Sequence, residues 1–574
     1  MKEQKSGVLS KVFSSKKLNS TVTSANTTGA EAWLGYFTGP CCVSIIYCML
    51  GGSYLTQFYT DVLGMSGAIL VLMPFFSKIV DAITNILMGR IIDRTRTGQG
   101  KARPWILMSG VFIMIAGILL YTVPKASQGV QIVWIVVSYN LFYAFAYTVY
   151  NMSHILMVPL STRNTKQRDS LALLSNAGVS MIPGMIGNLI MPYLIRMVGV
   201  GSAAQAGWIK MMCVLSVFAL PGVLLEYYFT KERVTEEAIR AGEFETNKEV
   251  VSFREQIRVA WKNPYWKMVL LIQIIFSIQN FLGTNSMVYY CNWVLADSVS
   301  EGANMQFLVN VIGQAPLGFG ILALWPLVRK FGKRRVMRVG FTFSAIGSLI
   351  VVLVSHMGIG PVLGGLILRS IGGIPCYIMS AQLAESMDHI EYESGIRVDG
   401  LSASIYSIVT TVSTGIGQSI LLAGINTLGY VAPASSTAHV TQNSAMQNFF
   451  IFCFAGANVI GNLLVVWILR KYDIEEKMPM ISAEIASRRK AEAEARGEVY
   501  LTPEELAAKE AEESERMTEE NRIRDLKARC EKKGLSFEAE EAKYQAKLAA
   551  QKQKEAEKKA KAKAKKASKA AGKK

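Results

Sequence analysis

The chain has 574 residues, of which 51% are hydrophobic, and its formal net charge is +18. Apolar runs of about 20 residues, the length needed to cross a hydrocarbon core of about 30 Å, recur along it and exclude an ordinary soluble protein. The eight cysteines and four histidines lack metal-ligand spacing, and no phosphate-binding glycine loop or catalytic triad is visible. We therefore expect no metal, no cofactor, no enzyme activity and no nucleic-acid partner.

Residues 1–30 are polar and basic and lack the apolar core of a signal peptide, so we expect a cytoplasmic N-terminal lead. Apolar segments follow, and we predict that they form twelve membrane-spanning helices. These lie near residues 33–59, 66–92, 104–123, 131–160, 170–196, 208–230, 266–296, 304–328, 336–356, 360–384, 400–428 and 445–470.

The loops between these segments differ in charge. Those after the second, fourth and eighth segments are rich in Lys and Arg, whereas those after the odd-numbered segments carry few charges. Basic loops stay on the cytoplasmic side of a membrane. We therefore expect a multi-pass protein of the cell membrane, with the even-numbered loops and both termini in the cytoplasm.

A charged loop at 231–265 divides the segments into an N-terminal half, residues 31–230, and a C-terminal half, residues 266–475. Similar basic turns follow the second helix of each half, at 89–104 and 329–335. This repetition predicts an internal duplication of six helices, as in the major facilitator architecture.

The composition changes after the last apolar segment. Residues 476–574 are mainly Ala, Glu, Lys and Arg and offer no apolar seam for a coiled coil. We expect a charged cytoplasmic tail, a solvated helix that ends in a disordered basic segment. Association of its lysine-rich end with anionic lipid is the alternative.

One acidic side chain lies inside the second apolar segment. A charge at membrane depth costs at least about 2.5–3.5 kcal/mol, so an intramembrane carboxylate is a functional candidate. Asp81 is that residue, with Lys78 three positions before it and Asn85 four positions after it, on the same helix face.

A transporter needs a polar cavity at mid-membrane, and several segments could supply its lining. Asn140, Tyr143, Tyr147, Asn151 and His154 recur at intervals of three or four in the fourth segment, on one helical stripe. Amides and hydroxyls both donate and accept hydrogen bonds, which favours a neutral polar solute; a polar helix interface is the alternative interpretation. The candidate solute-binding residues are Tyr147, Asn151, His154, Asn176, Asn280 and Thr414.

Charged residues also gather at the cytoplasmic helix ends. They could form ion pairs that close one side of a transporter, or they could be ordinary solvated charges. The candidates are Asp93, Arg94, Lys101, Arg103, Glu385, Asp388, Glu391 and Arg397. Arg369 differs from these because it lies well inside the tenth segment and needs an internal partner that the sequence does not identify.

The motif DAITNILMGRIIDRTRTGQGKARPWIL, which begins at Asp81, resembles the helix 2 signature of the glycoside–pentoside–hexuronide:cation symporters. Three further segments resemble that family in the same order: FYTDVLG at 58–64, NMSHILMVPLSTRNTKQRDSL at 151–171 and AESMDHIEYESGIRVDG at 384–400. The resemblance covers residues 33–475 and implies an all-α fold, with twelve transmembrane helices in two six-helix halves.

The resemblance also implies roles for single residues. In that family the first carboxylate of an Asp-x-x-x-Asp pair on helix 2 takes part in cation coupling, and its position is Asp81 here. The preceding basic residue is kept as Lys78, but the second carboxylate is replaced by Asn85. The acidic position of helix 4 that contacts sugar corresponds to Asn151, and the lysine of helix 11 to Thr414.

We therefore expect a monomeric secondary transporter in the lipid bilayer that imports a glycoside or related small sugar by alternating access. It would couple uptake to H⁺ rather than Na⁺, because Asn85 leaves the coupling site with one carboxylate. The same fold could carry a non-sugar solute, or the protein could be a receptor or scaffold that acts through its tail.

Overall fold

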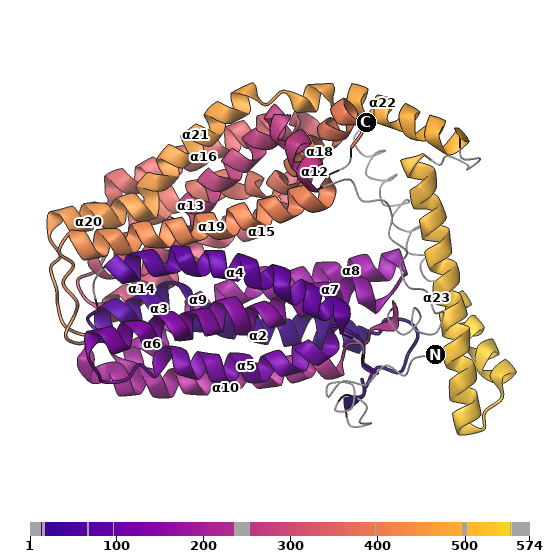
Figure 1. Ribbon diagram of the computed structural model, residues 1–574, viewed down its shortest axis with the longest axis horizontal. Helices are drawn as coiled ribbons and strands as arrows, with labels where there is room; N and C mark the ends of the chain where they lie inside the picture. Colours follow the sequence, from indigo (N-terminus) through magenta and orange to yellow (C-terminus); the bar gives the residue numbers. More distant parts are fainter. Residues whose placement is uncertain are drawn as a thin grey trace, which may run out of the picture.

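The computed structural model is almost entirely helical. It describes residues 18–65, 68–95, 97–234, 253–396, 398–495 and 502–550, together with Phe13 and Gln553. Two helical bundles lie side by side (Figure 1), the first formed by residues 31–228 and the second by residues 264–471. The bundles meet at the end where α14 and α20 lie, and diverge toward the end where α12, α22 and α23 lie.

The first bundle holds six helical runs, several of which contain a π-helical turn. The first run comprises η2 (Glu31–Thr38), α2 (Gly39–Leu50), α3 (Gly52–Gln57) and η3 (Phe58–Val62), and the second and third are α4 (Ala68–Arg94) and α5 (Arg103–Tyr121). The fourth comprises α6 (Gln128–Asn140), η4 (Leu141–Tyr147) and α7 (Thr148–Ser161). The fifth comprises α8 (Thr165–Asn176), η5 (Ala177–Met181) and α9 (Ile182–Val198), and the sixth comprises η6 (Ser202–Ala204) and α10 (Gln205–Tyr228).

The second bundle follows α12 (Phe253–Lys262) and repeats this order. Its first run is α13 (Pro264–Trp293), and the second comprises α14 (Val299–Leu308), η7 (Val309–Gly313) and α15 (Gln314–Phe331). The third comprises α16 (Lys333–Val354) and η8 (Ser355–Met357), and the fourth comprises α17 (Ile359–Gly373), η9 (Ile374–Ile378) and α18 (Met379–Ser394). The fifth is α19 (Asp399–Thr427), and the sixth comprises α20 (Ser444–Ile451), η10 (Phe452–Gly456) and α21 (Ala457–Lys471).

Eleven of these runs are long and apolar enough to cross a membrane. The remaining one, from α14 to α15, occupies the position of the eighth predicted segment and is continuously helical. The predicted all-α fold is therefore confirmed, with two groups of six helical runs. The chain is a multi-pass membrane protein.

Glycines let neighbouring helices approach closely, as membrane helices require. A Cβ atom on Gly372 would lie 2.2 Å from the backbone nitrogen of Ser344, and one on Gly347 would lie 2.3 Å from that of Arg369. These glycines stand between α16 and α17. Larger residues there would force the two helices apart.

A carboxylate just after α10 holds the first turn of α5. Glu232 accepts hydrogen bonds from the backbone N–H groups of Lys101 at 2.9 Å, and of Ala102 and Arg103 at 2.8 Å. The first N–H groups of a helix have no partner within the helix and form the positive end of its dipole. The carboxylate therefore stabilises this helix start.

The same arrangement recurs in the second bundle. Glu475, just after α21, accepts hydrogen bonds from the N–H groups of Lys333 at 2.7 Å and Arg334 at 2.8 Å at the start of α16. Each turn contains a glycine with positive φ, +106° at Gly100 and +80° at Gly332, a conformation that glycine adopts freely. The two basic turns thus share their backbone geometry as well as their charge.

The tail departs from the expectation of a solvated helix. In α22 (Ile474–Ala495) the side chains of Ile481 and Ile485 are buried against the second bundle, and Arg489 pairs with Glu391 of α18 at 2.8 Å. Helix α23 (Pro503–Lys533) lies against the first bundle, where Asn164 donates a hydrogen bond to the carbonyl of Ser514. Most of the basic end, beyond residue 550, lies outside the described residues.

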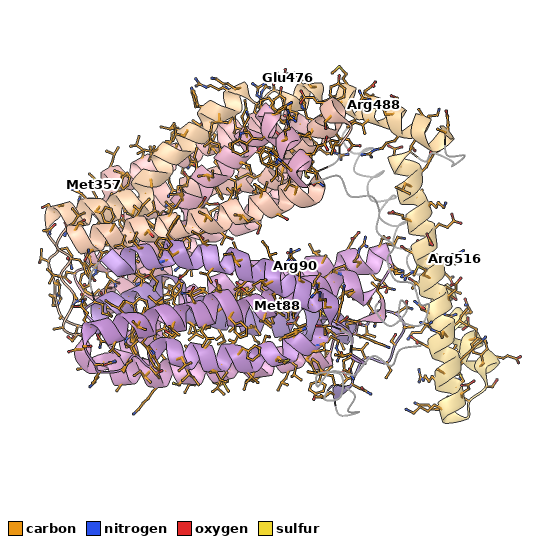
Figure 2. The ribbon with its side chains drawn as sticks, in the orientation of Figure 1. Met88, Arg90, Met357, Glu476, Arg488 and Arg516 are labelled. Carbon is orange, nitrogen blue, oxygen red and sulfur yellow. The ribbon has the colours of Figure 1, made fainter. Side chains whose placement is uncertain are left out.

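Figure 2 shows where these segments stand relative to the bundles. Glu476, Arg488 and Arg516 lie at the end from which the tail helices extend, and Met357 lies at the opposite end.

Candidate functional site

A cavity of about 480 Å³ lies between the two bundles. Its lining is mainly aromatic and polar, and both bundles contribute. From the first come Tyr47, Tyr54, Lys78, Tyr139 and Tyr143; from the second come Gln273, Asn280, Thr284, Asn285, Thr410, Thr414 and Gln418. Cavities of this size and composition accept a small polar molecule.

Stacked tyrosines form the wall on the first bundle. The rings of Tyr47 and Tyr147 are nearly parallel, with centroids 3.7 Å apart, and Tyr143 meets Tyr47 edge-on at 5.7 Å. The Tyr143 hydroxyl accepts a hydrogen bond from the backbone N–H of Gly52 at 3.0 Å. These contacts fix the rings, so that flat faces line the cavity.

Asp81 stands beside this wall on α4. Its Oδ2 lies 3.6 Å from the Lys78 Nζ, and its Oδ1 accepts hydrogen bonds from Asn85 Nδ2 at 3.2 Å and Thr148 Oγ1 at 3.0 Å. Lys78 in turn lies 5.3 Å above the ring of Tyr143, a cation–π contact. The predicted triad is thus one connected group next to the cavity, joined by Thr148 from α7.

Amides and hydroxyls form the wall on the second bundle. Gln273 Nε2 donates to the hydroxyls of Ser277 at 3.0 Å and Thr410 at 2.9 Å, and its Oε1 accepts from Tyr406 at 2.5 Å. Tyr139 of the first bundle donates to Gln418 Oε1 at 3.4 Å, which connects the two walls.

The predicted solute-binding residues occupy different places. Asn280 and Thr414 line the cavity, and Tyr147 supports it from behind Tyr47. Asn151 and Asn176 are not among the described residues that line it. Neither is His154, although it belongs to the same stripe of the fourth helical run.

His154 is buried in a separate polar cluster. Its Nδ1 lies 2.7 Å from Glu226 Oε1 and its Nε2 lies 2.8 Å from the Ser175 hydroxyl, while Tyr150 donates to Glu226 Oε2 at 2.7 Å. Glu226 is fully buried. We overlooked this residue in the sequence, although it is a carboxylate within an apolar run, the same signal that identified Asp81.

A second group overlooked in the sequence closes the end of the cavity remote from the tail. Asp61 Oδ1 accepts hydrogen bonds from Tyr430 and Thr60, each at 2.8 Å, and the Thr60 hydroxyl lies 3.0 Å from that of Tyr289. Tyr289 and Tyr430 belong to the second bundle, so these bonds join the bundles. The motif FYTDVLG at 58–64 had already pointed to this segment.

The predicted gating residues form contacts within one bundle or with the tail. Glu385 pairs with Lys333 at 2.5 Å, and Arg103 donates to Gln99 Oε1 and to the carbonyl of Tyr227, both at 2.9 Å. Glu391 pairs with the tail, and the N–H of Lys101 binds Glu232, as described above. Arg94 is exposed and Asp388 is half-buried on α18. Only the backbone of Asp93 is described, and Arg397 lies outside the described residues.

Comparison with known proteins agrees with this architecture. Residues 35–476 match the model of the MFS/sugar transport protein family. The isoprimeverose transporter of Lactiplantibacillus pentosus is 26% identical over 75% of this chain and 86% of its own length. The glucuronide carrier protein homolog of Escherichia coli K12 is 25% identical over 80% of this chain and 96% of its own length.

Among solved structures, that of a D-xylose-proton symporter superimposes with a TM-score of 0.51 at 13% identity, over 76% of this chain and 96% of the other. This likeness supports the fold. The family model spans all the helical runs described above except for the tail helices. The chain belongs to the MFS/sugar transport protein family and is a membrane transporter of a small-molecule solute, not an enzyme.

Proposed function

We propose that the protein imports a glycoside or related small sugar together with a proton across the cell membrane. The main support is the cavity between the bundles, where aromatic faces and amide groups stand beside the partly buried Asp81–Lys78 pair. Aromatic faces stack on the apolar faces of sugar rings, and amides and hydroxyls match ring hydroxyls. The names of the relatives support a sugar-like solute.

The solute would cross the membrane if this cavity opened first to one side and then to the other, never to both at once. We propose that both termini and the basic loops face the cytoplasm, as the loop charges predict. With that orientation, the Asp61–Tyr430 and Thr60–Tyr289 contacts would close the outer side of the cavity. Breaking these contacts and closing the cytoplasmic side would complete the cycle.

The surroundings of Asp81 favour a proton over sodium. Sodium needs several oxygen ligands, whereas Lys78, Asn85 and Thr148 all direct hydrogen-bond donors at this carboxylate. The orientation of Asn85 is fixed by a second bond, from its Nδ2 to the Asp81 carbonyl at 2.8 Å. A proton needs only the one carboxyl group, and its arrival would release Lys78.

Imposed gradients test this coupling. In vesicles with radiolabelled methyl β-D-glucoside and methyl β-D-glucuronide, an inward pH gradient should accelerate uptake of the accepted glycoside. Asp81→Asn should abolish that acceleration while exchange of solute at equilibrium survives. The control is Asp297→Asn, which alters an exposed carboxylate paired with His439. Uptake driven by a sodium gradient at fixed pH, insensitive to a protonophore, would overturn the proton assignment.

The remaining expectations extend this proposal. We propose that the unit of transport is the monomer, since one chain supplies both walls of the cavity. We also propose that the lysine-rich segment after residue 550 associates with anionic lipid of the inner leaflet.

A further inference from the structure

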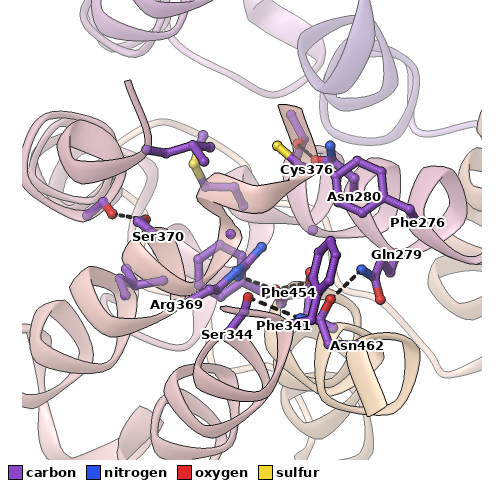
Figure 3. Close-up of a pocket in the computed structure, with 18 of the residues that line it drawn as sticks. Phe276, Gln279, Asn280, Phe341, Ser344, Arg369, Ser370, Cys376, Phe454 and Asn462 are labelled. Atoms are coloured by element: carbon purple, nitrogen blue, oxygen red, sulfur yellow. Dashed lines mark hydrogen bonds between the residues drawn. The ribbon is translucent and has the colours of Figure 1, made fainter. Parts of the chain in front are cut away.

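A single arginine stands in the middle of the second bundle. Arg369 lies on α17 about 15 Å along the helix from Ile359, at a rise of about 1.5 Å per residue, which is half of a hydrocarbon core of about 30 Å. Its side chain is half-buried and lines a cavity of about 140 Å³. Figure 3 shows it directed toward the space that Asn280 and Phe454 also line.

This guanidinium has no anionic partner among the described residues. Its Nη1 donates to the carbonyl of Phe454 at 2.9 Å, and its centre lies 5.4 Å above the Phe454 ring. The sequence explains the lack of a carboxylate: no Asp or Glu occurs at 302–384, 264–296, 400–428 or 444–472. The helices of this bundle that could face Arg369 therefore hold no acidic side chain at membrane depth.

An uncompensated cation in a low-dielectric site is costly, and such residues mark substrate or ion pathways. The neighbouring polar groups are neutral amides and hydroxyls: Gln279 donates to Asn462 at 2.8 Å, and Asn462 donates to Ser344 at 3.1 Å. These bonds hold the wall in place around Arg369 but supply no charge. Because no described carboxylate pairs with Arg369, a bound anionic ligand would supply the missing charge.

The small cavity adjoins the central one. Phe276, Asn280 and Thr284 line both, so a solute held between the bundles can reach toward Arg369. On the opposite wall Lys78 is paired with Asp81 in this structure, whereas no carboxylate among the described residues pairs with Arg369.

We propose that Arg369 and the cavity around it form an oxyanion subsite of the solute site, so that the transported sugar carries a carboxylate or a similar oxyanion. This rests on the proposed function and narrows its substrate class. A planar guanidinium binds a carboxylate through paired hydrogen bonds, which a neutral hydroxymethyl group cannot form.

Two glycosides that differ only at C6 test the subsite. Methyl β-D-glucuronide has a carboxylate there and methyl β-D-glucoside a hydroxymethyl group. In exchange assays at pH 7 the wild-type protein should prefer the glucuronide by about tenfold or more, because an unpaired buried donor strongly disfavours the neutral analogue. Arg369→Gln should remove that preference, and Arg369→Lys should keep part of it. The control Arg335→Gln removes an exposed charge at the start of α16 and should leave the preference unchanged.

The outcomes separate this inference from the proposed function. Exchange of glucoside as readily as glucuronide by the wild-type protein would overturn the subsite and leave sugar transport standing, and this comparison needs no variant that must fold. An unchanged preference in Arg369→Gln would overturn it as well. Glucoside exchange that requires added inorganic sulfate would assign the subsite to a free anion instead. Exchange of neither glycoside would overturn both proposals.

Discussion

At the scale of single residues, the polar side chains inside the bundles are of two kinds. Some, such as Asn280 and Thr414, face the cavity and keep hydrogen-bonding capacity for a solute. Others, such as His154 and Glu226, are saturated by protein partners. Only the first kind can determine which solute binds, whereas the second kind holds the helices together.

Substitution by leucine should separate the two kinds. Asn280→Leu removes donors and acceptors from the cavity wall, and solute affinity should fall about tenfold or more while the amount of folded protein stays normal. His154→Leu leaves the Glu226 carboxylate buried without one of its two partners, which costs about 3–5 kcal/mol, so the thermal midpoint and the membrane abundance should fall.

Exchange assays and thermal unfolding of the same preparations provide the comparison. Normal affinity in Asn280→Leu would exclude this residue from the solute site. A stable His154→Leu protein that fails to bind solute would instead place His154 in the transport machinery, as the stripe in the sequence first suggested.

The sequence reveals which residues share a helix face but not what lies opposite that face. Asp81, Lys78 and Asn85 could be grouped because they stand three and four positions apart on one helix. The partner of His154 lies 72 positions away, on another helix, and Thr148 approaches Asp81 from a third. Helix periodicity therefore predicted the spans and the grouping of Asp81, Lys78 and Asn85, whereas inter-helix contacts decided which stripe residues reach the cavity.

At the scale of elements, the third helix of each bundle begins at a glycine turn held by a carboxylate from the end of the sixth. Glu232 and Glu475 lie far apart in the chain yet perform the same task. Each joins the third helical run of its bundle to the end of the sixth. The duplicated basic turns seen in the sequence are thus one half of a contact whose acidic half the sequence analysis did not identify.

Removing either carboxylate should destabilise its bundle. Glu475→Ala leaves the N–H groups of Lys333 and Arg334 without this acceptor, a loss comparable to that of a helix N-cap, about 0.5–2 kcal/mol. The matched control is Glu476→Ala, in which the lost side chain is 73% exposed and pairs with Arg334 at the surface. That change should cost less than about 0.5 kcal/mol.

The midpoint of heat-induced unfolding in detergent measures both variants, and Glu232→Ala should resemble Glu475→Ala. Equal midpoints for Glu475→Ala and Glu476→Ala would show that the cap contributes no more than a surface charge.

At the scale of the whole molecule, the tail contacts both bundles. Helix α22 continues from the last membrane helix and packs on the second bundle, and α23 rests on the loop between α7 and α8 of the first. There Lys166 pairs with Glu515 at 2.6 Å and, through that hydrogen bond, holds the pKa of the Glu515 carboxyl below its ordinary value. This pair is therefore complete at neutral pH, and its contribution is lost as the pH falls through that lowered pKa.

The composition of the tail could not predict this docking. Few of its side chains are apolar, and α23 attaches mainly through polar contacts. Ser514 shares a hydrogen bond with Thr165, Thr518 accepts one from Asn164, and Asp525 accepts one from Ser24, which precedes the first bundle. Such contacts have no periodic signature in the sequence, because each depends on where a distant loop presents its donors and acceptors. The composition of the tail therefore predicts a solvated helix, whereas in the structure part of the tail is docked on the bundles.

A disulfide between α23 and the first bundle tests this docking. The hydroxyls of Thr165 and Ser514 lie 2.8 Å apart, so cysteines at both positions would bring their sulfur atoms within bonding reach. In Thr165→Cys/Ser514→Cys, with a protease site inserted at 496–501, mild oxidation should keep the cleaved tail attached until a reductant is added. The control pair Thr165→Cys/Ser487→Cys places the second thiol on α22, against the other bundle, and should release the tail. Equal release from both pairs would show that α23 is not docked there.

A chain ending at Ala495 tests whether transport needs α23. Its solute uptake should persist because both walls of the cavity lie before that residue.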